Sequence, residues 1–555
     1  MEQDFAGLIA PNSKMVIEFI SDEMPVSENT ETKKRFLRIN PNCNYIISNH
    51  FNVDAKQADT ILFNSSIFAT LTIKKLMTFI KKFMDKIKDT ATVMFVLENL
   101  SYADNITALL NGQPPTVKAT LTLNELQSAL EQSDMSIIRT FSTSKQAVVS
   151  RTIVEMAKTK LNVDKYIVCA VKKSALQTMK RTLIQSYLGE TLVCATIRVN
   201  DPNHFMALSS NVHVQSTPSG KPLNLLPDDG KYNNKILINQ RVSVNAVEAG
   251  INMFNKIVDF KYLLIEEMDD NPIIWRKKYE GSQFINFIAC HGLQTSTKPL
   301  ADFFSQFNPH VKIFENQLKE LPPARNFKAE TAQGKPITIF FGALNREKDF
   351  AEILPAINKI AAEYGNNIAF NIIAKRDLFN SVESPNKTFV GDDKIYDGQY
   401  VPYNVYEQVL RNSHIALLPL RDTIFNRSKS DLKFIECAGN GAVVLASPTV
   451  YANSVKDGET GFIYKDVNEF YNKLKLLINN ANKRYQIAEN AYNYVKHNRL
   501  LSQHYEERWN WYNELSARLP ELNAEVYKRI ELLKEKGVTA FGGFKEEMEG
   551  NNENL

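Results

Sequence analysis

Residues 425–447 read FNRSKSDLKFIECAGNGAVVLAS, and this stretch joins a helix pattern to a strand pattern. A helix is predicted to open near Asp431, whose side chain would cap it. After the turn GNGA, residues 442–446 are apolar on both faces, as in a parallel strand that is covered on both sides. A helix that turns tightly into such a strand is typical of a doubly wound α/β domain.

The same pattern continues on the N-terminal side of this stretch. Three more short apolar runs predict parallel strands at residues 337–341, 369–374 and 415–420. Between the first two, Phe350, Ile353 and Ile357 fall on one face of a predicted amphipathic helix. Residues 336–515 are therefore predicted to form one doubly wound domain.

Two further α/β domains are predicted before it. In residues 176–325 the predicted strands are 192–197, 235–238, 262–265 and 285–289, and a Pro- and Gly-containing hinge follows at 321–336. In residues 1–175 the predicted strands are 16–19, 45–47, 60–63, 92–97 and 166–171. Residues 516–555 are predicted to form a charged helix and a disordered acidic tail.

Composition excludes several classes of protein. The chain has 555 residues, 44% of them hydrophobic, and a formal net charge of only +4, which gives no support for a nucleic-acid-binding or membrane-binding surface. Five scattered cysteines form no CxxC pair, so reduced thiols in the cytoplasm are expected rather than disulfides or a metal site. The N-terminus lacks the pattern of a signal peptide, and no apolar stretch is long enough to span a membrane.

Polar residues suited to anions follow two of the predicted strands, where ligands of doubly wound sheets bind. The first group starts the loop after residues 337–341, and the second precedes the helix near Asp431, whose free N–H groups form an anion site. The residues concerned are Gly342, Arg346, Lys348, Arg427, Lys429 and Ser430. The alternative is that the cations among them are ordinary solvated surface charges.

Two further side chains are candidates for contact with a substrate. Glu436 lies within the predicted helix, where its carboxylate can accept hydrogen bonds from two neighbouring hydroxyls, such as those of a ribose. The alternative for Glu436 is a buried helix acid that is paired with Lys433. His291 follows the predicted strand 285–289 and is predicted to contact a bound substrate, with a structural histidine as the alternative. Asp269 and Asp270 are more typical of a turn than of a catalytic base.

Residues 336–512 resemble the nucleotide-sugar-binding domain of GT-B glycosyltransferases, family 4-like. Gly342, Leu344, Glu347 and Lys348 match the Gly-Arg-Leu…Glu-Lys loop of the family. Glu436 matches the second glutamate of its Glu-x7-Glu motif, and residues 457–461 match its Asp-Gly-Glu-Thr-Gly loop. The resemblance implies two Rossmann-like domains in the GT-B arrangement, a nucleoside-diphosphate sugar as donor, no metal, and retention of the anomeric configuration.

The chain departs from the family pattern at three places. Ala343 replaces the loop arginine, Ser428 replaces the first glutamate, and residues 192–202 hold no glycine-rich loop. We therefore expect the diphosphate site to be rebuilt from Arg346, Arg427 and Lys429, with Lys348, Arg346 and His291 as the catalytic candidates. Gly342, Arg427, Lys429, Ser430 and Glu436 are the candidates for donor binding.

The first 175 residues resemble a class I methyltransferase that has lost its cofactor loop. Ile20, Asp22 and Met24 stand where such folds place glycines, so side chains would fill the space of S-adenosylmethionine. No S-adenosylmethionine binding is expected, and an active methyltransferase is disfavoured.

The predicted function is metal-independent transfer of a sugar from a nucleoside-diphosphate sugar to a glycan or a lipid-linked glycan. A lipid-linked acceptor requires only peripheral contact with the inner face of the membrane. The alternative is a non-catalytic nucleotide-binding or scaffold protein built from decayed transferase domains, which the losses at Ala343 and Ser428 favour.

Overall fold

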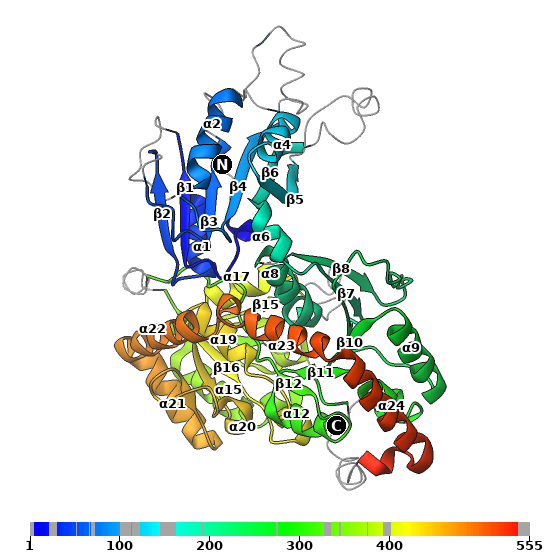
Figure 1. The fold of residues 1–555 in the computed structure, drawn as a ribbon. Coiled ribbons are helices and arrows are strands. Elements are labelled where there is room, and N and C mark those ends of the chain that lie inside the picture. The colour runs from blue at the N-terminus through cyan, green and yellow to red at the C-terminus, as the bar shows by residue number, and fades with distance from the viewer. Residues whose placement is uncertain are drawn as a thin grey trace. The chain divides into compact units, whose positions relative to one another are not determined.

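The structure is a computed structural model. It describes residues 5–21, 30–50, 53–65, 67, 73–99, 113, 122–144, 163–190, 193–209, 211–272, 276–326, 335–342, 346–373, 376–391 and 401–541. The chain forms two compact units (Figure 1). The N-terminal unit comprises residues 1–180 and 208–211, and the C-terminal unit comprises residues 181–207 and 212–555.

The N-terminal unit is built on one six-stranded sheet with the order β2-β1-β3-β4-β6-β5. β6 runs antiparallel to both of its neighbours, and the other pairs are parallel. The strands are β1 Met15–Phe19, β2 Asn44–Ser48, β3 Thr60–Phe63, β4 Thr92–Glu98, β5 Met135–Ser144 and β6 Val163–Lys172. The five strands that the sequence predicts here are confirmed.

Aromatic side chains fill the core of this unit. The ring of Phe63 stacks between those of Phe19 and Phe95, with centroids 5.3 and 5.2 Å away. The described helices are α1 Glu31–Ile39, α2 Ile73–Met84, α4 Leu123–Glu131 and α6 Lys173–Thr178. α4 begins at a capping box, in which the side chain of Thr122 accepts from the Glu125 amide and the Glu125 side chain accepts from the Thr122 amide.

The first domain of the C-terminal unit holds an all-parallel sheet with the order β12-β11-β10-β9-β7-β8. Its strands are β7 Thr182–Leu188, β8 Val212–Pro218, β9 Asn234–Gln240, β10 Tyr262–Glu267, β11 Gly292–Thr295 and β12 Val311–Ile313. The described helices are α7 Val193–Ala195, the π-helix η4 Thr196–Asn200, α8 Asp201–Ser209, α9 Val247–Asp259, α10 Arg276–Glu280, α11 Ile285–Ile288 and α12 Lys298–Ser305.

Two strand predictions in this domain are wrong. Residues 192–197 were expected to form its first strand, but the described part of that segment lies in α7 and η4, and the strand is β7. Residues 285–289 were expected to form a strand, but they lie in and just after α11, and β11 starts three residues later. The predictions at 235–238 and 262–265 are confirmed by β9 and β10.

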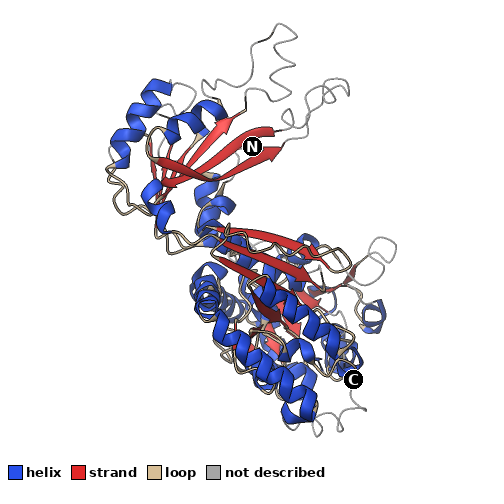
Figure 2. Ribbon diagram, turned by 45° about the vertical axis from the view of Figure 1, so that its right-hand side comes forward, coloured by secondary structure: helices blue, strands red, loops and turns tan. Residues whose placement is uncertain are grey.

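The second domain holds another all-parallel sheet, with the order β15-β14-β13-β16-β17-β18. Figure 2 shows the strands of the chain in red and its helices in blue. Its strands are β13 Ile337–Gly342, β14 Ile368–Ile373, β15 Lys387–Val390, β16 Ile415–Leu418, β17 Val443–Ala446 and β18 Phe462–Ile463. The four predicted strands of this domain are confirmed. The two parallel sheets together confirm the predicted α/β class with two Rossmann-like domains.

Helices cover the second sheet, and most of them connect one strand to the next. They are α14 Glu347–Ala351, α15 Leu354–Tyr364, α16 Arg376–Ser381, α17 Tyr403–Arg411, α18 Ile424–Arg427, α19 Leu432–Gly439, α20 Pro448–Tyr451, α21 Val467–Asn479 and α22 Ala481–Asn498. The helix predicted around Phe350 and Ile357 is split into α14 and α15, and Pro355 lies in the first turn of α15. Both residues are buried in the core, as predicted.

The last two helices belong to the core of the first domain rather than to that of the second. α23 is Tyr505–Ala517 and α24 is Leu519–Lys536. Val526, Ile530 and Leu533 of α24 lie in one apolar cluster with residues of β7, β9 and β10. The predicted charged helix after residue 516 is thus an amphipathic helix with a buried face, while the predicted acidic tail after 541 lies outside the described residues.

Candidate functional site

The candidate site lies at the carboxyl ends of the strands of the second sheet. β13 is the first strand of that domain; β14 and β15 follow on one side of it, and β16, β17 and β18 on the other. The strand order therefore reverses between β13 and β16, which is where doubly wound sheets bind their ligands. Arg346 follows β13 and Arg421 follows β16, so each of the two strands at this point is followed by an arginine.

A buried carboxylate joins these two arginines. Asp349, with 6% of its surface exposed, lies in α14. Its Oδ1 accepts from the backbone N–H of Arg421 at 2.9 Å and from the amide of Asn426 at 3.3 Å. Its Oδ2 accepts from Arg346 at 3.2 Å, and the same guanidinium nitrogen donates to Asn426 Oδ1 at 3.2 Å. Four residues from three loops and helices thus form one polar cluster.

Lys348 and Gly342 are close to Arg346 in the sequence. Lys348 is exposed on α14, one residue before Asp349. Gly342 ends β13, and a Cβ there would come within 3.1 Å of the Phe340 ring. The loop positions Ala343 and Leu344 lie outside the described residues, so the expected departure at Ala343 has no structural description.

Arg427 and Lys429 do not join the cluster. The exposed guanidinium of Arg427 forms a two-pronged pair with Asp422, at 2.5 and 2.8 Å. Lys429 Nζ lies 2.5 Å from Asp270 Oδ1 and 4.1 Å from the centroid of the Phe425 ring. Each of these predicted diphosphate cations therefore already has a carboxylate partner in the structure.

Residues 428–430 connect the two domains of the C-terminal unit. The hydroxyl of Ser428 accepts from Asn271 at 3.2 Å, and its carbonyl accepts from Thr297 at 3.0 Å. The hydroxyl of Ser430 accepts from Asn316 at 2.8 Å. Asn271 and Thr297 both follow strands of the first sheet, so the carboxyl ends of strands from both sheets meet at this segment.

In the first domain, Arg241 forms ion pairs with three carboxylates. It contacts Asp269 at 2.6 Å, Asp270 at 2.9 Å and Glu190 at 2.9 Å. Burial alone would lower the pKa of Arg241, but nearby negative charge, mainly that of Asp269, raises it above its usual value. The two aspartates lie in the loop after β10, as expected, and they pair with cations, so neither is the free carboxylate that a catalytic base requires.

Glu436 is buried in α19, with 2% of its surface exposed. Its Oε2 accepts from the Tyr406 hydroxyl at 2.9 Å and from Lys433 Nζ at 3.1 Å. The pairing with Lys433 is the alternative that the sequence left open for this residue. Burial first, and then the charge of Glu436, raise the pKa of Tyr406, so this hydroxyl stays protonated and can donate.

Asp431 occupies the N-cap position of α19, as predicted, but its side chain does not cap the helix. It instead pairs with both terminal nitrogens of Arg499, at 2.5 and 2.8 Å, and accepts from the Ser454 hydroxyl at 2.6 Å. The prediction of a side-chain cap is wrong, because a charge-assisted pair with arginine is stronger than a single hydrogen bond to an amide.

His291 lies in the core and not at the candidate site. It is fully buried; its Nδ1 accepts from the Leu264 amide at 2.8 Å, and its Nε2 lies 2.8 Å from Asn523 Oδ1. Burial lowers its pKa to about 4. Because both ring nitrogens are engaged, the geometry is that of the structural histidine and contradicts the predicted contact with a substrate.

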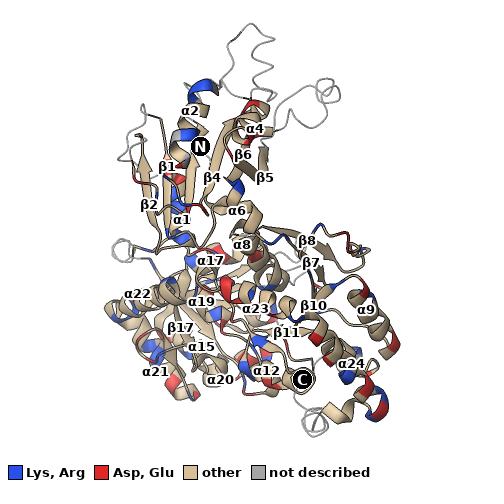
Figure 3. Ribbon diagram, in the orientation of Figure 1, with Lys and Arg blue, Asp and Glu red and all other residues tan. Residues whose placement is uncertain are grey.

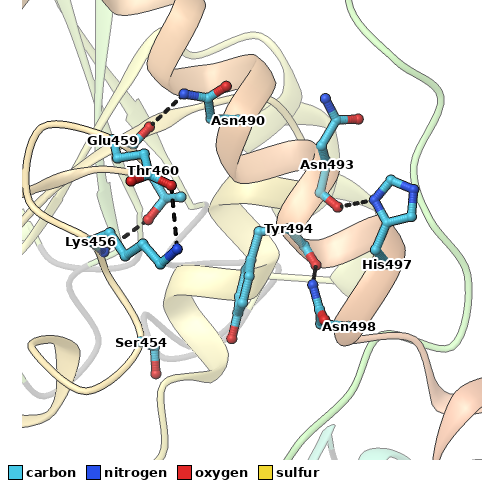
Figure 4. Close-up of a pocket in the computed structure, with 9 residues that line it drawn as sticks. All are labelled: Ser454, Lys456, Glu459, Thr460, Asn490, Asn493, Tyr494, His497 and Asn498. Carbon is cyan, nitrogen blue, oxygen red and sulfur yellow. Dashed lines mark hydrogen bonds and ion pairs between the residues drawn. The ribbon is translucent and has the colours of Figure 1, made fainter.

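The segment 457–461 forms the tight turn that the sequence predicts, with Gly458 at φ +74° just before β18. One side of a polar pocket of about 410 Å³ is formed by this turn and the other by α22 (Figure 4). The pocket is lined by Ser454, Lys456, Glu459, Thr460, Asn490, Asn493, Tyr494, His497 and Asn498. It contains no predicted site residue.

A glycine that the sequence prediction missed lies at the corresponding point of the first sheet. Gly189 follows β7, and its N–H donates to Gln240 O at 2.7 Å at the end of β9. A Cβ at Gly189 would come within 2.5 Å of Arg241 O, so only glycine fits. The sequence analysis expects the first strand at 192–197 and its loop after that, whereas the strand is β7 and ends at Leu188. The signal in the sequence is the end of β7 followed directly by Gly189.

The described residues contain no group of three or more His, Cys, Asp or Glu side chains that could hold a metal ion. All five cysteines are unpaired thiols. Every helix in the described part of the chain is too short or too polar to cross a membrane. Basic and acidic residues are interspersed over both units (Figure 3).

Residues 356–512 match a family model described as glycosyl transferase-like. They include Arg421, Glu436 and the 457–461 turn. No curated protein matches the chain. The matched segment begins within α15 and ends within α23, so it covers Arg421 and Glu436 but not Arg346, Lys348 or Asp349.

Several solved structures are similar to this chain. Sucrose-phosphate synthase from Thermosynechococcus elongatus has 12% sequence identity and a TM-score of 0.43, with 61% of this chain and 100% of that one covered. A glycosyltransferase from Rickettsia africae has 12% identity and a TM-score of 0.42, with 60% and 98% covered. The Anabaena protein HepE, in complex with UDP and glucose, has 11% identity and a TM-score of 0.41, with 60% and 98% covered.

Proposed function

We propose that this chain is a GT-B glycosyltransferase, family 4-like, that transfers a sugar from a nucleoside-diphosphate sugar to a glycan or a lipid-linked glycan. The observation that carries the proposal is the position of Arg346 and Arg421, at the point where the strand order of the second sheet reverses. Cations at this point suit the diphosphate of the donor.

In the proposed reaction, the acceptor hydroxyl oxygen forms a bond to the anomeric carbon, and the bond from that carbon to the diphosphate oxygen breaks. The electron pair leaves on the diphosphate, which also takes up the hydroxyl proton. Lys348 and Arg346 stabilise the charge that grows on the leaving group, and Glu436 holds the ribose. The anomeric configuration is retained. His291 has no part in this reaction, because it is buried away from the strand ends.

For the N-terminal unit we propose a methyltransferase-like domain that does not bind S-adenosylmethionine. Support comes from the side chain at Ile20, which is buried directly after β1, where a glycine would let a cofactor approach the backbone. For the whole chain we propose a cytoplasmic location, with at most peripheral contact at the inner face of the membrane.

A thermal-shift screen against UDP, GDP, ADP and their sugar conjugates tests the proposed donor class. A ligand at 100 times its dissociation constant should stabilise the folded protein by ~2.7 kcal/mol. Stabilisation by one base series, followed by turnover of its sugar conjugate, supports the proposal. Binding of the nucleotide without any hydrolysis or transfer would favour a non-catalytic nucleotide-binding protein, and no binding of any probe would refute the donor site.

The proposed site neutralises the diphosphate with side-chain cations, so turnover should not depend on a metal ion. We expect the rate in excess EDTA to equal the rate in Mg²⁺ or Mn²⁺. A complete loss of activity in EDTA that either ion restores would contradict the proposed site.

A further inference from the structure

We propose that Arg346 and Arg421 form a two-arginine clamp for the donor diphosphate and that Asp349 is the positioning residue of this clamp. The inference rests on the proposed function and changes which cations are assigned to the donor diphosphate. Sequence considerations pointed to Arg346, Arg427 and Lys429, whereas the geometry points to Arg421 in place of the latter two.

The backbone of Arg421 is hydrogen-bonded, and its side chain reaches the surface. Its backbone N–H donates to Asp349 Oδ1 at 2.9 Å, and its Nε lies 3.6 Å from the same oxygen. This distance is too long for a hydrogen bond, and Arg421 Nε is buried without a hydrogen-bond partner among the described residues. The side chain as a whole is 35% exposed. The accessible part of this guanidinium is suited to binding an anion, because its planar N–H groups match the oxygens of a phosphate.

Arg346 reaches the same carboxylate from the other strand. It precedes α14, is 25% exposed, and donates to Asp349 Oδ2, while Arg421 contacts Oδ1. One carboxylate thus binds the guanidinium of Arg346 and the backbone N–H of Arg421, on either side of the point where the strand order reverses. Two arginines and one aspartate leave a net charge of +1 at the cluster.

The burial of Asp349 argues that its role is to orient the arginines. A carboxylate next to an anion site weakens anion binding by electrostatic repulsion, unless it also contributes a larger favourable term to the free energy of binding. Holding the Arg346 guanidinium and the Arg421 backbone in place before the ligand arrives gives such a gain, because less ordering of long side chains is then needed at binding. Arg427 and Lys429 lack this arrangement, since each forms a separate pair with one aspartate.

Calorimetric titration with inorganic pyrophosphate and with a nucleoside diphosphate tests the clamp in the full-length protein. Arg421→Ala should weaken the binding of both ligands at least tenfold and leave the binding of the bare nucleoside unchanged. Arg427→Ala is the matched control, because it removes an exposed, carboxylate-paired arginine from the same region and should change the affinity less than twofold. Circular dichroism establishes that each variant is folded.

The variant Asp349→Asn distinguishes a positioning role of Asp349 from simple proximity to the anion site. Removing a negative charge should by itself strengthen the binding of an anion, but loss of the positioning carboxylate should weaken pyrophosphate binding severalfold. Stronger binding in Asp349→Asn, or unchanged binding in Arg421→Ala, would overturn the clamp. A wild-type protein that binds pyrophosphate through Arg421 but turns over no sugar nucleotide would refute the proposed function and leave the clamp standing.

Discussion

Lys348 and Glu436 occupy opposite environments, and the difference separates their expected effects on catalysis. Lys348 is exposed on α14, whereas Glu436 is buried in α19. Charge grows on the leaving diphosphate in the transition state, so Lys348→Ala should lower kcat by roughly 10²-fold. The ribose does not change during the reaction, so Glu436→Gln should mainly raise the KM for the donor, by the ~1–3 kcal/mol of a charge-assisted hydrogen bond.

Steady-state kinetics and nucleoside-diphosphate binding, measured on both variants, check this split. Lys433→Ala is the control for Glu436→Gln, because it removes the cation that is paired with Glu436 but keeps the carboxylate. If both Lys348→Ala and Glu436→Gln leave binding and turnover intact in folded protein, the donor-site assignment is wrong.

His291 should make the stability of the protein depend on pH. Its pKa in the folded protein is about 4, against 6.5 in an exposed histidine, mainly because of burial. Below pH 6.5 the unfolded chain binds a proton that the folded chain excludes, so the free energy of unfolding should fall by up to about 3 kcal/mol between pH 6.5 and 4. His291→Gln should remove this component.

Urea unfolding of wild type and His291→Gln at pH 7.0 and 4.5 measures the effect as a difference between the two proteins. The exposed His497 gives the control, and His497→Gln should follow the wild-type dependence on pH. An equal loss of stability in wild type and His291→Gln would show that His291 is not the group responsible.

Single residues show how far the candidate site could be predicted from the sequence. Gly342, Arg346 and Lys348 were found because they follow an obvious strand within a few residues. Asp349 and Arg421 were not found, because the hydrogen bond between them joins positions 72 residues apart. Local spacing carries no information about which charges meet across neighbouring strands.

At the level of elements, the missed strand β7 has polar residues at buried positions. β7, TLIQSYL, buries Thr182, Gln185 and Ser186, so it does not look like a buried strand. Gln185 is satisfied by hydrogen bonds to Gln215 and Asn224, which the sequence does not reveal. The strand prediction at 285–289 failed for another reason. A short, mostly apolar run fits one helical turn, here α11, as well as it fits a short strand.

The C-terminal helix α24 provides the clearest test of packing. Ile530 is 3% exposed and lies in the core cluster of the first domain. Ile530→Ala should cost about 2–5 kcal/mol of unfolding free energy, because it leaves a cavity. The exposed Lys528 lies on the same helix, and Lys528→Ala should change stability by less than about 0.5 kcal/mol. Denaturant unfolding of the two variants compares them directly; equal stability would mean that α24 does not complete this core.

For the whole molecule, the separate sheet and core of the N-terminal unit allow its ligand binding to be tested independently of the transferase site. We expect no heat of binding when S-adenosylmethionine is titrated into the full chain, because side chains follow β1 where a cofactor needs glycines. The nucleoside diphosphate that stabilises the protein serves as a positive control in the same sample. Low-micromolar affinity for S-adenosylmethionine would contradict this expectation.

The packing of α24 into the first domain has a consequence for biosynthesis. The strands of that domain end at Ile313, but Val526, Ile530 and Leu533 of its core are translated roughly 200 residues later. At a ribosomal rate of about 5–20 residues per second, the core of the nascent first domain stays incomplete for on the order of 10–40 s, until its last residues are synthesised. During that interval it exposes an apolar surface, so this chain should depend on chaperones in the cell more than a protein whose domains are each complete when they leave the ribosome.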